Sequence, residues 1–317
     1  MIYLSKYGPR IAKISLGTAG FGSAVDRETA FSLLDEYYEA GGNLFDTARV
    51  YADWLPHGHG ASERTLGEWI TSRGLRDRVL ISTKGAHPPM GALHTSRVNR
   101  ESILFDIEES LRTLSTDYVD IYFLHRDDES RPVSEIMPTL HELVQSGKVR
   151  FLGASNWRAA RIAEANAFAN ENGLTPFAFS QIMYSYAETN TERFEDDTQV
   201  VMSPEEYAAY RNTDLTLMAF SSQGQGFFSR AAENGLDNLS PSFRAKYDNK
   251  TNCARLVKLK KITAETGIAP TALGLLPLLY NPDFDTLPII GPSRPETLRA
   301  SLAALDCPLK YISELLT

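Results

Sequence analysis

The stretch that decides the fold of this 317-residue chain is Gly42-Asn43-Leu44-Phe45-Asp46-Thr47-Ala48-Arg49-Val50-Tyr51. A short apolar run ends in Asp46, and Tyr51 follows five positions later in the loop beyond it. Two further apolar runs end in Lys84 and in His125. Because each of these groups comes directly after a buried strand, the pattern predicts acid–base side chains gathered at one rim of a sheet, and therefore an enzyme.

Strand-like and helical segments alternate outward from this stretch, and eight strand–helix units in a chain of this size predict a closed (β/α)8 barrel, or TIM barrel. We expect one domain over residues 1–317, which begins with a small hairpin in residues 1–10 with Tyr7-Gly8-Pro9 as its turn. The expected strands are 11–16, 43–46, 79–83, 118–124, 149–154, 177–181, 215–220 and 286–290. The expected helices are 27–41, one from Ser62, 99–115, 133–147, 157–172, 203–212, 251–266, 270–280 and 295–305, with an irregular stretch at 221–250.

The composition excludes several classes of protein. The chain is 43% hydrophobic, so it can bury a large core, and its net charge of −8 offers no basic face for nucleic acid. No apolar run approaches the roughly 18 residues of a membrane span. The first residues lack the long apolar region of a signal peptide. Cys253 and Cys307 are the only cysteines, so we expect no disulfide framework and a cytoplasmic location.

The chain resembles the aldo-keto reductases along nearly its whole length. The resemblance rests on Phe45-Asp46-Thr47-Ala48 with Tyr51, Gly60-x-Ser62-Glu63-x-x-Leu66-Gly67, Ser82-Thr83-Lys84, Leu124-His125, Gly153-Ala154-Ser155-Asn156, Gln181 and Pro288-Ile289-Ile290-Gly291. It implies the reduction of a small-molecule aldehyde or ketone with NADP(H) as the cofactor.

The chemistry of the four ionisable groups agrees with that implication. A carbonyl that accepts hydride becomes an alkoxide and needs a proton, for which Tyr51 is the expected donor. Lys84 is expected to lower the tyrosine pKa, Asp46 to hold Lys84, and His125 to orient the carbonyl oxygen. Taken singly, each residue has a plainer interpretation as a turn, packing, solvated or core residue.

The resemblance also implies a set of cofactor-binding residues. Ser155, Asn156 and Gln181 correspond to the residues that bind the nicotinamide carboxamide, and Phe220 to the ring that stacks on the nicotinamide, unless it is only a core residue. The remaining candidates are Gly17, Thr18, Ser221, Gln223, Gly224 and Gly226.

Three residues after the last strand correspond to the site of the adenosine 2′-phosphate: Ser293, Arg294 and Thr297. An arginine there favours NADP over NAD, because guanidinium holds phosphate in a bidentate fork, although Arg294 near a helix start can also be simply solvated. Ser301 stands where relatives often have an asparagine near the adenine.

Substrate choice is less constrained. Trp54, Arg126 and Trp157 suggest a tryptophan wall with charged neighbours, which suits a polar or sugar-like carbonyl compound. Alternatively, Arg126 pairs with Asp127 or with a helix terminus. His57-x-His59 has no third ligand at suitable spacing, so we expect no metal.

The short chain beyond Leu305 suggests an open pocket, because relatives that bind bulky apolar substrates often have a longer carboxyl-terminal loop. A second function remains open, that of an NADP-binding redox sensor resembling the β-subunits of potassium channels. The sequence leaves the oligomeric state unknown.

Overall fold

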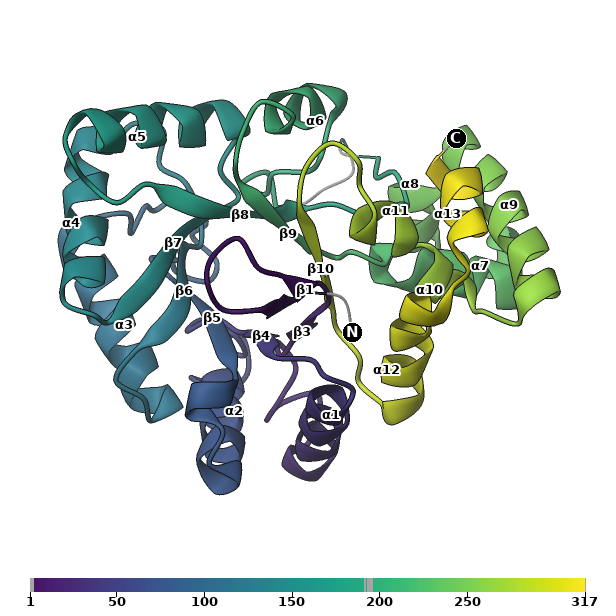
Figure 1. Ribbon diagram of the computed structural model, residues 1–317, viewed down its shortest axis with the longest axis horizontal. Helices are drawn as coiled ribbons and strands as arrows, with labels where there is room; N and C mark the ends of the chain where they lie inside the picture. Colours follow the sequence, from purple (N-terminus) through teal and green to yellow (C-terminus); the bar gives the residue numbers. More distant parts are fainter. Residues whose placement is uncertain (1–2, 191, 193–195, 317) are drawn as a thin grey trace.

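Eight parallel strands close into a barrel in the computed structural model, which describes residues 3–190, 192 and 196–316 (Figure 1). The order around the barrel is β10-β3-β4-β5-β6-β7-β8-β9, so neighbours in sequence are neighbours in space except at the closing pair. The predicted (β/α)8 barrel is confirmed. The strands are β3 (Ser15–Gly17), β4 (Leu44–Asp46), β5 (Leu80–Gly85), β6 (Val119–Leu124), β7 (Val149–Ser155), β8 (Phe177–Met183), β9 (Thr216–Phe220) and β10 (Thr286–Ile290).

The register of the strands brings their carboxyl ends to one rim. Asp46 is paired with Ser82 on β5, Lys84 with Phe123 on β6, and Ser155 with Gln181 on β8. Parallel strands all run the same way, so groups that end different strands converge at the same mouth of the barrel.

Some of the surrounding helices start at a residue whose side chain caps the first turn. The Asp26 side chain accepts from the amide of Thr29 at 3.0 Å, and Asn99 accepts from the amide of Ser102 at 2.9 Å. These helices bury an apolar stripe on the barrel and expose the opposite face. They are α1 (Arg27–Glu39), α2 (Ala61–Arg73), α3 (Arg100–Leu114), α4 (Val133–Gln145), α5 (Ala159–Glu171), α6 (Pro204–Tyr210), α9 (Lys250–Thr266) and α12 (Pro295–Leu302).

The amino-terminal hairpin is longer than expected, and the first barrel strand is shorter. The expected strand 11–16 is divided, because β2 (Ile11–Ala12) pairs with β1 (Tyr3–Leu4) and only β3 joins the barrel. Asn43 favours this break, since its side chain accepts from the amide of Ala12 at 2.8 Å. The hairpin lies over the barrel end opposite the catalytic rim, where the Tyr7 hydroxyl lies 2.8 Å from Thr216 Oγ1 (Figure 1).

The expectations for the last third of the chain need three corrections. The stretch 221–250 contains α7 (Phe227–Asn234) and α8 (Pro241–Tyr247). The expected helix 270–280 is two pieces, α10 (Pro270–Leu273) and α11 (Leu276–Leu279), because Gly274 ends the first and Pro277 cannot donate a backbone hydrogen bond within a longer one. The chain beyond Leu305 forms α13 (Leu309–Leu316), which lies beside α9 and α11 in Figure 1.

Among the described residues, no single helix has the length and apolar character to cross a membrane. The segments α9 and Pro270–Leu279 reach that length and composition only as a pair bent by 117°.

Candidate active site

Three of the four predicted acid–base groups meet in a hydrogen-bonded chain at the barrel rim. The Lys84 ammonium donates to Asp46 Oδ2 at 2.7 Å, to the carbonyl of Thr47 at 2.8 Å and to the Tyr51 hydroxyl at 3.0 Å. Lys84 has no exposed surface, so its charge is fixed by these partners instead of by water. The other Asp46 oxygen, Oδ1, accepts from Ser82 at 2.7 Å and from Gln181 at 2.9 Å, which leaves the carboxylate little freedom to move.

His125 lies on the other side of Tyr51, with ring centroids 5.9 Å apart. Its imidazole is buried, and its Nδ1 has no hydrogen-bond partner among the described residues. Burial and the nearby charges, among them Arg126 and Lys84, hold the pKa of His125 well below its usual value. The ring is therefore neutral at physiological pH, and a neutral imidazole can donate to a carbonyl oxygen from one nitrogen.

The pKa of Tyr51 differs from the sequence-based expectation. Burial raises the pKa of the phenol above 10, and the opposing effect of Lys84 does not cancel it. Burial alone would lower the pKa of Lys84, but Asp46 and Tyr51 raise it above its usual value. Lys84 lowers the pKa of Tyr51, as expected, but burial outweighs this effect, and the Asp46 carboxylate adds to the increase. The resting pair is a neutral phenol hydrogen-bonded to an ammonium.

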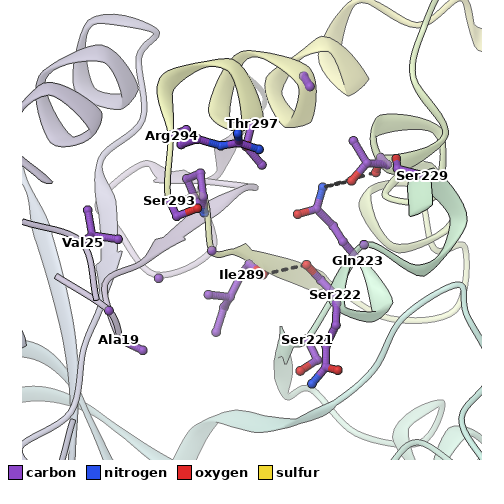
Figure 2. Close-up of a pocket in the computed structure, with 18 of the residues that line it drawn as sticks. Ala19, Val25, Ser221, Ser222, Gln223, Ser229, Ile289, Ser293, Arg294 and Thr297 are labelled. Carbon is purple, nitrogen blue, oxygen red and sulfur yellow. Dashed lines mark hydrogen bonds between the residues drawn. The ribbon is translucent and has the colours of Figure 1, made fainter. Parts of the chain in front are cut away.

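A cavity of about 790 Å³ runs from Tyr51 and Asp46 between β9, β10 and the amino-terminal ends of α7 and α12 (Figure 2). In Figure 2, Arg294 and Thr297 lie on one side and Gln223 on the other. Eight of the residues expected to bind the cofactor line this cavity: Gly17, Phe220, Ser221, Gln223, Gly226, Ser293, Arg294 and Thr297. The Arg294 side chain is exposed and makes no hydrogen bond or ion pair within the described part of the chain.

Five predicted cofactor residues do not line the cavity: Thr18, Gly224 and the three expected at the carboxamide, Ser155, Asn156 and Gln181. The Thr18 hydroxyl is buried and donates to the Asp46 carbonyl at 3.1 Å, so its contribution is to hold β3 beside β4. Gly224 is buried against Ala187, whose Cβ would lie 2.7 Å from any Cβ added at position 224. Its positive φ of 54° explains the glycine without a ligand.

The three residues expected at the carboxamide are buried just below the rim. Asn156 donates to the His125 carbonyl and to Ser155 Oγ, both at 3.2 Å. Its side-chain oxygen accepts from the amide of Val200 at 3.2 Å. Gln181 is already engaged with Asp46, so protein contacts alone hold these three side chains in place.

Gln223 links the two walls of the cavity. Its side-chain nitrogen donates to Thr271 Oγ1 at 2.7 Å and to Ser301 Oγ at 3.0 Å. Ser301, noted only as a departure from related chains, is thus the partner of Gln223. Arg230 and Thr271 also line the cavity and were missed, because 221–250 was expected to be irregular. The signal that could have found Arg230 was its place one turn after Gly226, since an arginine near the start of a helix that follows glycines is suited to bind an anion.

The three predicted substrate residues have different surroundings. Trp54 is 52% exposed on the loop after β4. Trp157 is fully buried, and its indole donates to the Arg126 carbonyl at 3.1 Å, so the prediction that it contacts substrate is wrong. Arg126 is buried and paired with Asp196 at 2.9 Å, which favours the alternative of an internal ion pair, although the partner is not Asp127.

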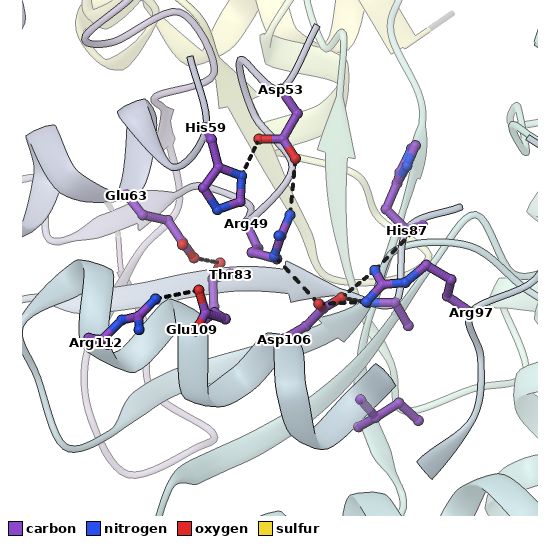
Figure 3. Close-up of polar contacts among 12 residues, drawn as sticks. Arg49, Asp53, His59, Glu63, Thr83, His87, Arg97, Asp106, Glu109 and Arg112 are labelled. Carbon is purple, nitrogen blue, oxygen red and sulfur yellow. Dashed lines mark hydrogen bonds and ion pairs between the residues drawn. The ribbon is translucent and has the colours of Figure 1, made fainter. Parts of the chain in front are cut away.

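A charged network supports the Tyr51 loop from the outer side (Figure 3). Arg49 lies 3.0 Å from Asp53 and 3.4 Å from Asp106, and Arg97 binds both oxygens of Asp106 at 2.7 and 2.8 Å. These residues line a second cavity of about 180 Å³ together with His87. His59 lies 3.1 Å from Asp53, and no cluster of three metal-ligating side chains is found within the described ranges.

His87 was missed, although it follows Lys84 by only three positions. Its ring packs edge-on against His125 at a centroid distance of 4.7 Å. Its Nδ1 lies 2.6 Å from the carbonyl of Pro88, which can only accept, so Nδ1 carries the proton.

Glu63 is another buried titratable group near the rim. It accepts from Thr83 Oγ1 at 2.6 Å, and burial raises the pKa of Glu63 to about 7.

Comparison with known proteins places the chain in a family. The model of the aldo/keto reductase family matches residues 13–312. A norsolorinic acid reductase of Emericella nidulans is 32% identical over 95% of this chain and 76% of its own length. An aryl-alcohol dehydrogenase of Pestalotiopsis microspora is 29% identical over the same shares. An uncharacterised oxidoreductase of Bacillus subtilis is 29% identical over 97% of this chain and 91% of its own. The chain belongs to the aldo/keto reductase family, oxidoreductases that act on carbonyl groups.

Proposed function

We propose that this protein reduces an aldehyde or ketone to the alcohol with NADP(H), and that Tyr51 donates the proton. The observation that carries the proposal is the chain of short contacts from Asp46 through Lys84 to Tyr51, next to the neutral ring of His125. Bound NADPH would supply the hydride to the carbonyl carbon.

The protein's own residues account for the other half of the reaction. The Tyr51 phenol is protonated at rest, so it is ready to give its proton to the oxygen on which negative charge develops. Lys84 lies 3.0 Å from the phenol oxygen and stabilises the phenolate that is left. Asp46 keeps Lys84 charged, and His125 is placed to hold the carbonyl oxygen beside Tyr51.

The cavity fits NADP in size and in chemistry. The cavity extends from Tyr51, and its wall includes Phe220, whose ring is only partly buried and suits stacking. Ser293, Arg294 and Thr297 stand at the start of α12, where backbone amides point outward and favour an anion. The unpaired guanidinium of Arg294 supports a 2′-phosphate at this end, and thus NADP in preference to NAD.

The structure widens the substrate expectation. Arg126 and Trp157 no longer support a sugar-like substrate, because the first is paired and the second is buried. Exposed Trp54 and Met90 remain near the rim, on the loops after β4 and β5. An exposed indole can stack on an aromatic carbonyl compound, as well as on the C–H face of a hydroxylated one. The names of the relatives, a norsolorinic acid reductase and an aryl-alcohol dehydrogenase, favour the aromatic class.

A turnover assay tests the proposal. The purified protein is mixed with NADPH and a panel of aromatic, aliphatic and hydroxylated aldehydes and ketones, and the loss of nicotinamide absorbance is followed. We expect turnover with at least one class, and product identified as the alcohol. Tight NADPH binding with no turnover across the panel would favour the redox-sensing alternative. Fractionation of the source cells would test the cytoplasmic location that we propose from the two unpaired cysteines.

A further inference from the structure

The guanidinium that follows His125 is bound to protein through all three of its nitrogens, two of which reach a distant loop. Arg126 Nη2 donates to Asp196 Oδ2 at 2.9 Å, Nε to Thr198 Oγ1 at 2.8 Å and Nη1 to the carbonyl of His125 at 2.9 Å. The arginine thus joins the backbone of a predicted catalytic residue to the segment 196–200, seventy positions further along the chain.

A second side chain makes a parallel bridge. Asn156 donates to the same His125 carbonyl and accepts from the amide of Val200. Its backbone has a positive φ of 58°, a conformation that costs free energy unless the surroundings hold it. Both bridges run from one carbonyl oxygen to the two ends of the segment 196–200, so the segment and His125 are placed together.

The segment 196–200 is itself ordered by Asp196. That carboxylate accepts from the amide and the hydroxyl of Thr198 and from the side chain of Gln199. At its far end, Val200 accepts from the amide of Met183 at 3.0 Å, which fixes the segment to the end of β8. These contacts hold the segment next to the ends of β7 and β8, close to the backbone of His125.

We propose that Arg126 is a positioning residue, which clamps the segment 196–200 against His125 so that this segment forms one wall of the substrate site. The assignment of this segment to a substrate site rests on the proposed carbonyl reduction. The clamp itself does not depend on that function. It assigns Arg126 no contact with substrate, because all of its donors face protein. Asp196, Thr198 and the Arg126 charge form one unit.

Three variants break this unit in matched ways. Arg126→Met keeps the length of the side chain and removes its donors, Asp196→Asn keeps the shape and removes the charge, and the double variant combines both. Arg131→Met is the control, since Arg131 pairs with Glu135 on the surface five positions away from Arg126. All four are compared with the wild type for NADPH affinity, KM and kcat, on one small aliphatic and one bulky aromatic aldehyde.

We expect both single variants to lose between about 10-fold and 10²-fold in kcat/KM for the bulky aldehyde, the range that follows when a supporting wall shifts. The loss should appear mainly in KM, be smaller for the small aldehyde, and be no greater in the double variant. NADPH affinity and the control should match the wild type. Losses that add in the double variant, or that are equal for both aldehydes, would overturn the proposal.

Two measurements work without turnover and keep the clamp testable if no carbonyl is reduced. Amide hydrogen exchange at Thr198 and Val200 should speed up in both single variants, and unchanged exchange would refute the clamp. The titration of His125, followed by histidine NMR and assigned with a His125→Gln variant, separates charge from packing. Groups facing His125 are Lys84, His87, Tyr51 and Arg126.

Loss of the Arg126 cation should raise the pKa of His125, since that cation helps to lower it. Loss of the Asp196 anion should not raise it. A merely structural role would change stability in both variants and would not produce this difference. If the pKa of His125 moves in the same direction in both variants, Arg126 does not hold its charge beside His125, and the proposal is overturned.

Discussion

The two halves of the barrel mouth are built in opposite ways. On the side of β4, β5 and β6, ionisable groups are buried and contact one another within the protein, as in the pair of Lys84 with Asp46. On the side of β9 and β10, a cavity of about 790 Å³ is lined by groups such as Arg294 that have no partner among the described residues. One half is complete without a ligand, and the other is shaped to receive one.

This difference indicates which step, chemistry or cofactor binding, each half of the mouth controls. Fixed, desolvated partners in the first half need no rearrangement when charge develops on the substrate oxygen, which is the condition for electrostatic stabilisation. In the second half, the exposed guanidinium of Arg294 has no partner among the described residues and is free to bind a ligand. Changes in the first half should therefore alter kcat, and changes in the second half should alter affinity for the cofactor.

The largest expected effect comes from Tyr51→Phe, which removes only the phenolic oxygen from the satisfied half. We expect kcat to fall by roughly 10²–10⁴-fold, because the variant loses the proposed general acid and the neutral imidazole of His125 only orients the carbonyl oxygen. NADPH binding, measured by fluorescence titration, should stay within about twofold of the wild type. Near-normal turnover would show that Tyr51 is not the proton donor.

The second effect concerns the stability of the same half and depends on pH. The pKa of Glu63 is about 7 in the folded protein, against 4.5 as its ordinary value. Its contribution to folding is fully present below pH 4.5 and is lost as pH rises through 7, because the unfolded chain ionises first. At about 1.4 kcal/mol for each pKa unit, the wild type should lose about 3 kcal/mol across this window.

Urea unfolding at pH 5 and pH 8 measures that loss. Glu63→Gln cannot ionise at position 63. The difference in unfolding free energy between the two pH values should therefore be smaller than in the wild type by most of the expected loss. Glu68→Gln is the matched control, because Glu68 pairs with Arg27 at the surface. A pH dependence equal in Glu63→Gln and the wild type would contradict the assignment.

The third effect belongs to the open half. Arg294→Ala should weaken NADPH by about 10-fold to 10²-fold, since a hydrogen bond to a charged group contributes about 1.5–3 kcal/mol. Affinity for NADH, which lacks the 2′-phosphate, should change little, and kcat at saturating NADPH should be near that of the wild type. Equal losses for both cofactors would remove Arg294 from the phosphate site.

The smallest effect is expected from Gln223→Ala, which cuts the link from the loop after β9 to Thr271 and Ser301. One or two neutral hydrogen bonds contribute about 0.5–1.5 kcal/mol each, so NADPH should dissociate roughly 2-fold to 10-fold faster. Stopped-flow release of NADPH measures this. Ser301→Ala should show a weaker form of the same change, and no change in either variant would mean that the link does not hold the cavity closed.

Much of the barrel was predictable, because local patterns carried it. The apolar runs ending in Asp46, Lys84 and His125 marked three strands, and parallel strands must bring those ends to one rim. The prediction was weakest at 221–250, where helices α7 and α8 are short. A helix of seven or eight residues spans only about two turns, and an apolar pattern that short does not distinguish a helix from a strand.

The sequence by itself determined the order of strands and helices, the family resemblance and the identity of the groups that converge, because these depend on periodicity and on residue type. Only the tertiary structure decided which neighbours those groups have. It buried Trp157, paired Arg126 with Asp196, placed His87 against His125, and raised the pKa of Tyr51. Each of these depends on contacts between residues far apart in the chain, and on the loss of water around them, neither of which a local pattern records.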